Sequence, residues 1–243
     1  MLRSKRSPTQ SQAEIFASYG WWDRHNLLNI ITASRCDYIQ HRVERVLGKS
    51  ALRQQEILEV GCGGGLICEE LARRGAVVTG LDPTEEALAV ARAHTQRSGF
   101  GQNAHFVRGY AESLPFADGS FSVIVCLDVL EHVRALDATV KELARVLAPG
   151  GILIFDTINR TPIARLVLIW IGERFFHQSG LVPGLHHYHA FIKPQELRTL
   201  LIKNNLQVRE LVGFMPYIHK GRFGLRPGWF KGVSYVGYAT KQR

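Results

Sequence analysis

Largely apolar runs alternate along the chain with longer segments in which apolar residues recur every three or four positions. The runs lie at 56–60, 77–82, 104–108, 121–127 and 152–156, and runs of this kind are typical of strands buried on both faces of a sheet. Helical periodicity follows Gly65, Pro83 and Asp137. This repeated alternation of strand and helix predicts an α/β fold with a doubly wound, Rossmann-like sheet.

Polar and helical segments precede this alternation. Residues 1 to about 12 are polar, and we expect them to be disordered. Apolar positions at helical spacing predict a helix from Leu27 to Leu47, which would cap the sheet. We therefore divide the chain into a disordered N-terminus with a helical cap (1–50) and a main domain (51–243), which carries an insertion at 159–190.

The densest glycine pattern follows the first predicted strand. Glu59 stands near the end of that strand, and Gly61, Gly63 and Gly65 follow before a helical pattern that begins at Leu66. Because glycine has no Cβ, such a loop can turn sharply and present backbone N–H groups to a ligand at the start of the helix. The pattern indicates a nucleotide-type binding site.

Details of the loop narrow the class of ligand. A dinucleotide fingerprint would need a third glycine where the chain has Leu66, and the loop has no lysine to pair with a polyphosphate. The acid Glu59 instead suits a ligand with cationic groups. Asp82 ends the second predicted strand, 21 residues after Gly61. An acid at this point can accept hydrogen bonds from both ribose hydroxyls of a nucleoside.

Polar residues also follow the later strands. Glu112 comes after the third strand, and Asp128, Glu131 and His132 come after the fourth. Because the carboxyl ends of parallel strands meet at one edge of a sheet, we expect these side chains to lie beside the glycine loop and Asp82.

Composition sets further bounds. The chain has 243 residues, 46% of them hydrophobic, which is enough for a folded domain with a full core. Its four cysteines form no C-x-x-C pair, which favours free thiols in a reducing compartment. The basic N-terminus has no apolar run behind it, so we expect no secretory signal and a cytoplasmic location. A net charge of +9 suits nucleic acid, anionic lipid or solubility alone.

The glycine loop and the acid at position 82 resemble motifs I and II of the class I S-adenosylmethionine-dependent methyltransferases. The resemblance implies a seven-stranded sheet, parallel except for its last strand, that binds S-adenosyl-L-methionine at the carboxyl ends of the strands. Arg35 in the cap would pair with the methionine carboxylate of this cofactor. The cofactor-binding residues indicated are Arg35, Glu59, Gly61, Gly63, Gly65, Asp82, Pro83, Ala111, Glu112 and Leu127.

Motifs outside the sheet are similar to those of the O-methyltransferase family of ubiquinone biosynthesis. They are Trp21-Trp22-Asp23, Asp128-x-x-Glu131-His132-Val133, Asn159-Arg160, the segments 182–186 and 191–197, and Val233-Ser234-Tyr235. The family implies a polyprenylated phenol or catechol as the methyl acceptor. Two departures bear on the substrate: Asp128 replaces a usual glutamate, and the family's Val-Pro-Lys-Gly-Thr-His lacks its lysine and has Leu185 for the threonine.

The residues after the fourth strand leave two chemical interpretations open. Methyl transfer is an in-line displacement, and a phenol of pKa about 10 is a poor nucleophile until it loses its proton. His132 is one candidate for the base. Alternatively Asp128, Glu131 and His132, which the family resemblance marks as a metal site, hold Mg²⁺ or another divalent ion that lowers the pKa of catechol oxygens. A further possibility is that Glu131 and His132 cap a helix and line the pocket without metal.

The insertion contains an apolar segment and a group of histidines. Residues 163–176 are apolar nearly all round and carry Arg165, Trp170 and Arg174, but they are too few to span a bilayer. Either this segment lies peripherally in the inner membrane surface and passes a polyprenyl tail to the pocket, or it is a buried helix that covers the site. The histidines at 186, 187 and 189 either bind metal, contact substrate or are solvated in a loop.

The leading hypothesis is therefore an O-methyltransferase that uses S-adenosylmethionine and a lipid-tailed phenol or quinol, with no nucleic acid partner. One alternative is a C- or O-methyltransferase of another quinone or natural product. A C-methyltransferase would need a carbon nucleophile and no metal. Another alternative is a non-catalytic basic module for RNA or membrane on the same fold. The intact glycine loop and Asp82 argue against that last alternative.

Overall fold

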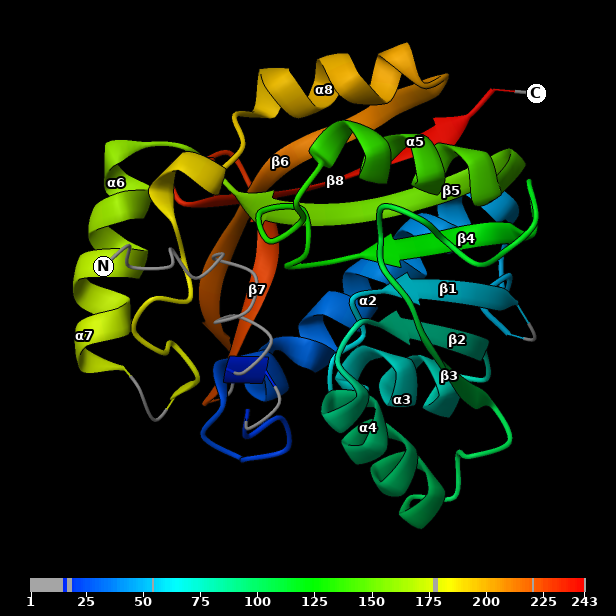
Figure 1. Ribbon diagram of the computed structural model, residues 1–243, viewed down its shortest axis with the longest axis horizontal. Coiled ribbons are helices and arrows are strands. Elements are labelled where there is room, and N and C mark those ends of the chain that lie inside the picture. The colour runs from blue at the N-terminus through cyan, green and yellow to red at the C-terminus, as the bar shows by residue number, and fades with distance from the viewer. Residues whose placement is uncertain (1–14, 17–18, 54, 177–178, 220, 243) are drawn as a thin grey trace, which may run out of the picture.

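The protein is built on one mixed sheet with helices on both of its faces (Figure 1). The computed structural model describes residues 15–16, 19–53, 55–176, 179–219 and 221–242. The predicted disorder of residues 1 to about 12 falls outside these described residues.

The strands follow the order β3-β2-β1-β4-β5-β8-β6-β7. They are β1 (Glu56–Val60), β2 (Val77–Asp82), β3 (Ala104–Arg108), β4 (Phe121–Cys126), β5 (Leu147–Ile158), β6 (Leu206–His219), β7 (Arg222–Gly228) and β8 (Ser234–Lys241). The first five strands pair parallel with one another, and β8 pairs antiparallel with both β5 and β6. The predicted doubly wound sheet with an antiparallel last strand is confirmed.

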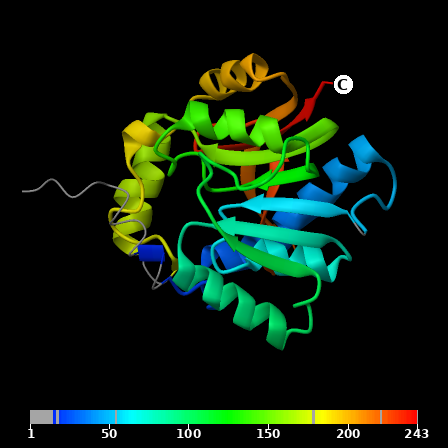
Figure 2. The ribbon, with the colours of Figure 1, turned by 45° about the vertical axis from the view of Figure 1, so that its right-hand side comes forward.

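Alternate residues of the parallel strands face two separate apolar cores. Leu58 and Leu153 share a core with α5 (Leu136–Val146) and α8 (Pro194–Lys203). Their neighbours Ile57 and Ile152 share the other core with α2 (Leu27–Leu47), α3 (Leu66–Arg73) and α4 (Glu85–Arg97). Figure 2, turned by 45°, shows the sheet between these two layers of helices. Burial on both faces explains the continuous apolar runs in the sequence.

Helix α2 has the bounds that the sequence predicts. The side chain of Asn26 accepts a hydrogen bond from the backbone N–H of Leu28 and caps its first turn, and Gly48 with φ of 109° ends it. Ile39 and Val43 are fully buried in the second core. The helix therefore holds the N-terminal cap against the sheet.

The described residues form eight strands, one more than the predicted seven. The extra strand, β7, pairs with β6 in the region around 220–231, where the sequence indicates a basic, glycine-rich loop. Gly224 lies against α2, and a Cβ there would stand 2.9 Å from the ring of Tyr217 and 3.2 Å from Cβ of Ser34. Glycine, which lowers strand propensity, is needed for this close packing, so the strand has little sequence signal.

The insertion forms a helix that stands apart from the sheet, at the left of Figure 1. It runs through α6 (Pro162–Ala164), a π-helical stretch (Arg165–Gly172) and α7 (Glu173–Phe175), and a 3₁₀ turn, Tyr188–Ala190, follows. π-Helical turns are rare and occur mostly at functional sites. No helix within the described ranges is long and apolar enough to cross a bilayer.

Candidate active site

A cavity of about 960 Å³ lies at the carboxyl ends of β1, β2 and β4. Its walls come from the cap, the glycine loop, the insertion and the β6–β7 hairpin. This volume is at the upper end of the range for small-molecule pockets. There is room for a nucleoside cofactor and a second molecule side by side.

The glycine loop forms as the sequence predicts. Gly61, Gly63 and Gly65 have φ values of 74°, 50° and 81°, a region that side chains with a Cβ rarely adopt. Asp82 holds the loop, because one carboxylate oxygen accepts a hydrogen bond from the N–H of Gly63 (3.0 Å) and the other accepts one from Thr84 (2.9 Å). Burial raises the pKa of Asp82. Asp82 also lines the cavity.

The cap lies directly on this loop. A Cβ at Gly63 or Gly64 would stand 2.3 Å from the ring of Trp21. The indole N–H of Trp22 donates to the carbonyl of Gly64 at 2.9 Å, and the Trp22 ring stacks on His94 with 3.3 Å between ring centroids. The glycines therefore serve two purposes: they allow the turn, and they admit the tryptophan above it.

The remaining residues with a predicted cofactor role are distributed around the cavity. Glu59, Pro83, Ala111 and Leu127 line it, together with Glu112, Arg35, Gly61 and Asp82. The carboxylate of Glu112 accepts a hydrogen bond from the backbone N–H of Arg134. Gly63 and Gly65 shape the loop without lining the cavity.

Arg35 forms a buried ion-pair network at the end of β4 and β5. Its guanidinium lies 2.6 Å from Asp128 and 3.0 Å from Asp156, and Asp156 also accepts the N–H of Asp128 at 2.7 Å. Burial acts to raise the pKa of Asp128, but the charge of Arg35 and its hydrogen bond, together with the nearby histidines, outweigh burial and lower it. Burial dominates at Asp156 and raises its pKa to about 8. Asp156 was not predicted, although it follows an apolar strand.

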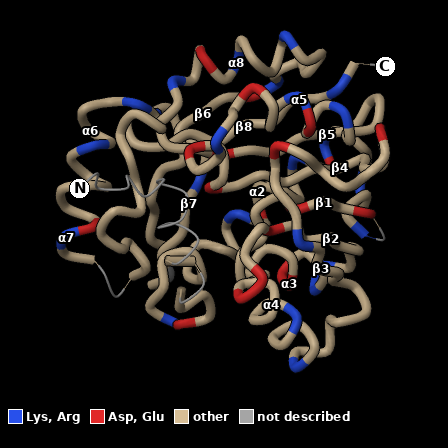
Figure 3. Tube along the Cα trace, viewed as in Figure 1, with Lys and Arg blue, Asp and Glu red and all other residues tan. Residues whose placement is uncertain are grey.

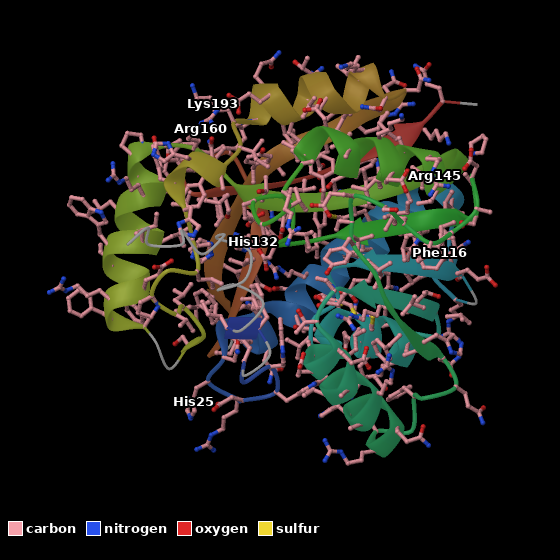
Figure 4. The ribbon with its side chains drawn as sticks, in the orientation of Figure 1. His25, Phe116, His132, Arg145, Arg160 and Lys193 are labelled. Carbon is pink, nitrogen blue, oxygen red and sulfur yellow. The ribbon has the colours of Figure 1, made fainter. Side chains whose placement is uncertain are left out.

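The three residues of the predicted metal set do not converge. The carboxylate of Asp128 is paired with Arg35, and Glu131 accepts a hydrogen bond from Thr157 (2.7 Å) and does not line the cavity. His132 lies at the cavity wall, between the strand ends and the insertion (Figure 4). Within the described ranges no three His, Cys, Asp or Glu side chains are grouped closely enough to hold a metal ion. The donors in this arrangement do not fit a divalent ion.

Burial also shifts the pKa values of Glu131 and His132, the other two residues of the predicted metal set. Desolvation raises the pKa of Glu131 to about 7, and the nearby charge of Asp128 acts in the same direction. Desolvation lowers the pKa of His132 to about 4. A histidine with this pKa is neutral near pH 7 and accepts a proton less readily than an exposed imidazole.

Four buried polar atoms have no hydrogen-bond partner in the described part of the chain. They are Nε1 of Trp21, Nε of Arg35, and one carboxylate oxygen each of Glu59 and Glu131. Buried polar groups are almost always hydrogen-bonded. Since Trp21, Arg35 and Glu59 all line the cavity, two donors and one acceptor are available there for a ligand.

A carboxylate–imidazole pair lies on the insertion side of the cavity. Glu173 accepts hydrogen bonds from the backbone N–H groups of Gly184 (2.7 Å) and His186 (2.8 Å), and one of its oxygens lies 3.0 Å from Nδ1 of His186. His186 lines the cavity, whereas His187 and His189 are exposed. The histidine group was visible in the sequence, but nothing in the sequence pointed to Glu173 as a partner.

Comparison with known proteins agrees with this arrangement. Residues 58–155 match the family model described as a methyltransferase domain. The chain is 35% identical over 240 residues, 96% of its length and 94% of the relative's, to the ubiquinone biosynthesis O-methyltransferase of Xanthomonas euvesicatoria, and equally identical, with the same coverage, to that of Xanthomonas campestris.

Solved structures show the same fold. Magnesium protoporphyrin IX methyltransferase from Synechocystis, with bound S-adenosylhomocysteine (SAH), superposes with a TM-score of 0.66 at 20% identity, over 97% of this chain and all of that one. A methyltransferase dependent on S-adenosylmethionine from Methanosarcina mazei gives a TM-score of 0.60 at 25% identity, over 78% and 93% of the two chains. With the glycine loop, Asp82 and the cavity in place, these likenesses show that the chain is a methyltransferase of the ubiquinone biosynthesis O-methyltransferase family.

Proposed function

We propose that this methyltransferase uses S-adenosylmethionine to methylate a hydroxyl of a lipid-tailed phenol or catechol, as in the biosynthesis of ubiquinone-type quinones. The names of the relatives support the reaction class. The observation that carries the proposal is a large cavity in which unpartnered groups for the cofactor lie beside an apolar wall. The two sides of the cavity supply separate support.

The cofactor side offers complementary groups for each part of S-adenosylmethionine. Asp82 suits the ribose hydroxyls, and Ala111, Glu112 and Leu127 lie where the adenosine would bind. The unpartnered carboxylate oxygen of Glu59 suits an ammonium group. The unpartnered N–H groups of Arg35 and Trp21 suit the methionine carboxylate.

The acceptor side is mostly apolar. Val167 and Leu168 of the insertion, Phe214 and Leu225 of the hairpin, and Ile158 at the end of β5 line it. A ring with an isoprenoid tail would bury its apolar surface against this wall, at about 25 cal/mol per Å². A small polar acceptor would leave the wall exposed to water.

The outer face of the insertion supports contact with a membrane surface. Trp170 is 59% exposed and Phe175 71% exposed, beside the exposed Ile163 and Leu166. Arg165 and Arg174 lie in the same helix, and the tube view shows further basic residues around it (Figure 3). Apolar side chains with flanking arginines suit the interface of an anionic bilayer. Because Val167 and Leu168 face the cavity, the same helix would connect the lipid to the site.

Binding and turnover test the reaction. Calorimetry should detect S-adenosylmethionine binding, and a short-tailed polyprenyl catechol should be methylated on oxygen, which NMR of the product distinguishes from a ring methyl. Binding with ring methylation would favour the C-methyltransferase alternative. No cofactor binding at all would refute the proposal and favour a non-catalytic module.

The same assay examines the metal hypothesis. The arrangement of Asp128, Glu131 and His132 predicts turnover that survives a chelator. Turnover that is lost with chelator and restored by Mg²⁺ would require Arg35 to leave Asp128 so that the carboxylate can bind the ion.

Vesicle flotation tests the membrane contact. Substituting Trp170→Ser and Phe175→Ser should remove binding to vesicles rich in phosphatidylglycerol. The matched control is Ile202→Ser, which changes an apolar residue that is 55% exposed on α8 and should leave binding intact. Equal flotation of both variants would reject the membrane role of residues 163–176.

A further inference from the structure

His186 is held in a defined orientation by a buried carboxylate. The side chain of Glu173 is only 7% exposed and that of His186 only 9%. Burial acts to raise the pKa of Glu173, but hydrogen bonds from His186 and from the backbone of Gly184 and His186 outweigh burial and lower it. Glu173 is therefore an anion that accepts hydrogen bonds from the loop and from the imidazole.

This hydrogen bond determines which ring nitrogen of His186 is available. An ionised carboxylate is only an acceptor, so Nδ1 must carry the proton that points to Glu173. In the neutral ring Nε2 is then the unprotonated nitrogen. Within the described residues the imidazole is hydrogen-bonded through Nδ1, and His186 lines the cavity. A carboxylate that orients an imidazole in this way also stabilises the imidazolium that forms on proton uptake.

His132, the base predicted from the sequence, is in a different position. The rings of His132 and His186 lie 5.8 Å apart, so both are within reach of an acceptor in the same part of the cavity. His132 also packs edge-on against Phe16 of the cap. These surroundings suit a wall residue better than a proton acceptor.

We propose that His186, oriented by Glu173, is the proton acceptor for the methylated hydroxyl. This inference rests on the proposed function. Nε2 of His186 takes the proton of the phenol, and the phenolate oxygen forms a bond to the methyl carbon. The bond between that carbon and sulfur breaks with its electron pair going to sulfur, which yields SAH. The imidazolium then returns its proton to water.

The position of the pair in the fold agrees with this assignment. Glu173 belongs to the insertion helix and Leu185, beside His186, is buried. The hydrogen bonds of Glu173 tie the helix to the loop that carries His186. The element that covers the acceptor side of the cavity therefore also carries the base. The same segment therefore covers the acceptor and supplies its proton acceptor.

Substrates of different acidity test the proposal. General-base catalysis contributes roughly 10²–10⁴-fold in rate, so His186→Ala should lower kcat/KM by about this factor with a short-tailed polyprenyl catechol. The loss should be less than about tenfold with a nitrocatechol, whose hydroxyl is already largely ionised near neutral pH. The kcat/KM of Glu173→Gln with the polyprenyl catechol should lie between that of His186→Ala and that of the native chain. His187→Ala, which changes an exposed neighbour, is the matched control and should behave as the native chain.

Cofactor affinity separates a catalytic loss from a folding loss. All variants should bind S-adenosylmethionine within about twofold of the native chain, since neither Glu173 nor His186 contacts the glycine loop. An equal loss on both substrates in His186→Ala would overturn the proposal. The proposal would also be overturned if the loss of kcat/KM depended on the acidity of the acceptor in His132→Ala and not in His186→Ala. A native chain that binds cofactor but methylates neither catechol would refute the proposed function, and the base with it.

Discussion

At the scale of single residues, the site and its surroundings contain more buried carboxyl groups than buried cations to pair with them. Glu59, Glu131 and Asp156 are all buried, and desolvation raises the pKa of each, to about 8, 7 and 8. Arg35 is the buried cation that pairs with Asp128 and Asp156. Glu59 lines the cavity, so a positively charged ligand there would favour its ionised form, which agrees with a sulfonium cofactor.

The affinity for S-adenosylmethionine should depend on pH through Glu59. Because its pKa is about 8 in the free protein, Glu59 carries a proton at pH 6–7, and a cationic ligand favours the ionised form. Binding should release a proton, and affinity should rise by up to about tenfold per pH unit before levelling near pH 8. Calorimetry between pH 6 and 9 measures this rise. Glu59→Gln should abolish the rise of affinity with pH. An equal rise in that variant would show that the released proton comes from another group.

Arg35 should matter for stability as well as for binding. Arg35→Ala would leave Asp156 buried without its cation, beside the partly exposed Asp128, and losing one partner of a buried pair costs about 3–5 kcal/mol. Urea unfolding measures the difference. Arg92, which pairs with Glu85 where both side chains are nearly half exposed, is the control, and Arg92→Ala should cost at most about 1 kcal/mol. Equal stability of the two variants would show that Arg35 has no structural role.

At the scale of elements, the glycine loop and the cap form one unit. The sequence predicted the loop, because glycine spacing after an apolar strand reflects local backbone requirements. It also predicted α2 with its bounds, from the apolar period alone. The contact of Trp21 with Gly63 and Gly64 joins segments far apart in the chain and leaves no periodic pattern.

A substitution at Gly64 tests this contact. Gly64→Ala would place a Cβ 2.3 Å from Trp21, so the cap must move, and we expect the Kd for S-adenosylmethionine to rise by at least about tenfold. In the cap, Gly20 has space, because a Cβ there would meet its first neighbour at 3.8 Å. Gly20→Ala should therefore bind normally. Unchanged affinity in Gly64→Ala would mean that the cap does not need to rest on the loop.

The side-chain pairs of the site could not be derived from the sequence either, because they also join segments that are far apart in the chain. Pairing of Arg35 with Asp128, and of Glu173 with His186, depends on how the cap and the insertion return to the sheet. The sequence placed Asp128, Glu131 and His132 together as neighbours in the chain, but it did not show that Asp128 pairs with Arg35 and that Glu131 accepts a hydrogen bond from Thr157.

At the scale of the whole molecule, cofactor binding should stabilise the fold globally. A ligand that binds only the native state at 100 times its Kd adds about 2.7 kcal/mol of stability, which for a chain of this length raises the Tm by roughly 5–10 °C. Thermal unfolding with and without S-adenosylmethionine measures the shift. Asp82→Ala, which loses the acid that organises the loop, should show little shift. An equal rise in the Tm of Asp82→Ala on adding S-adenosylmethionine would mean that the ligand binds away from Asp82.

The hydroxyl of Tyr19 donates to the carbonyl of Gly180 at 3.0 Å and so ties the cap to the insertion. The cap covers the cofactor loop and the insertion covers the acceptor side, and neither can open without disturbing the other. This coupling favours an ordered kinetic mechanism in which the cofactor enters first and its demethylated product leaves last. SAH would then compete with S-adenosylmethionine for the free enzyme, and the ratio of the two in the cell would set the flux through the reaction.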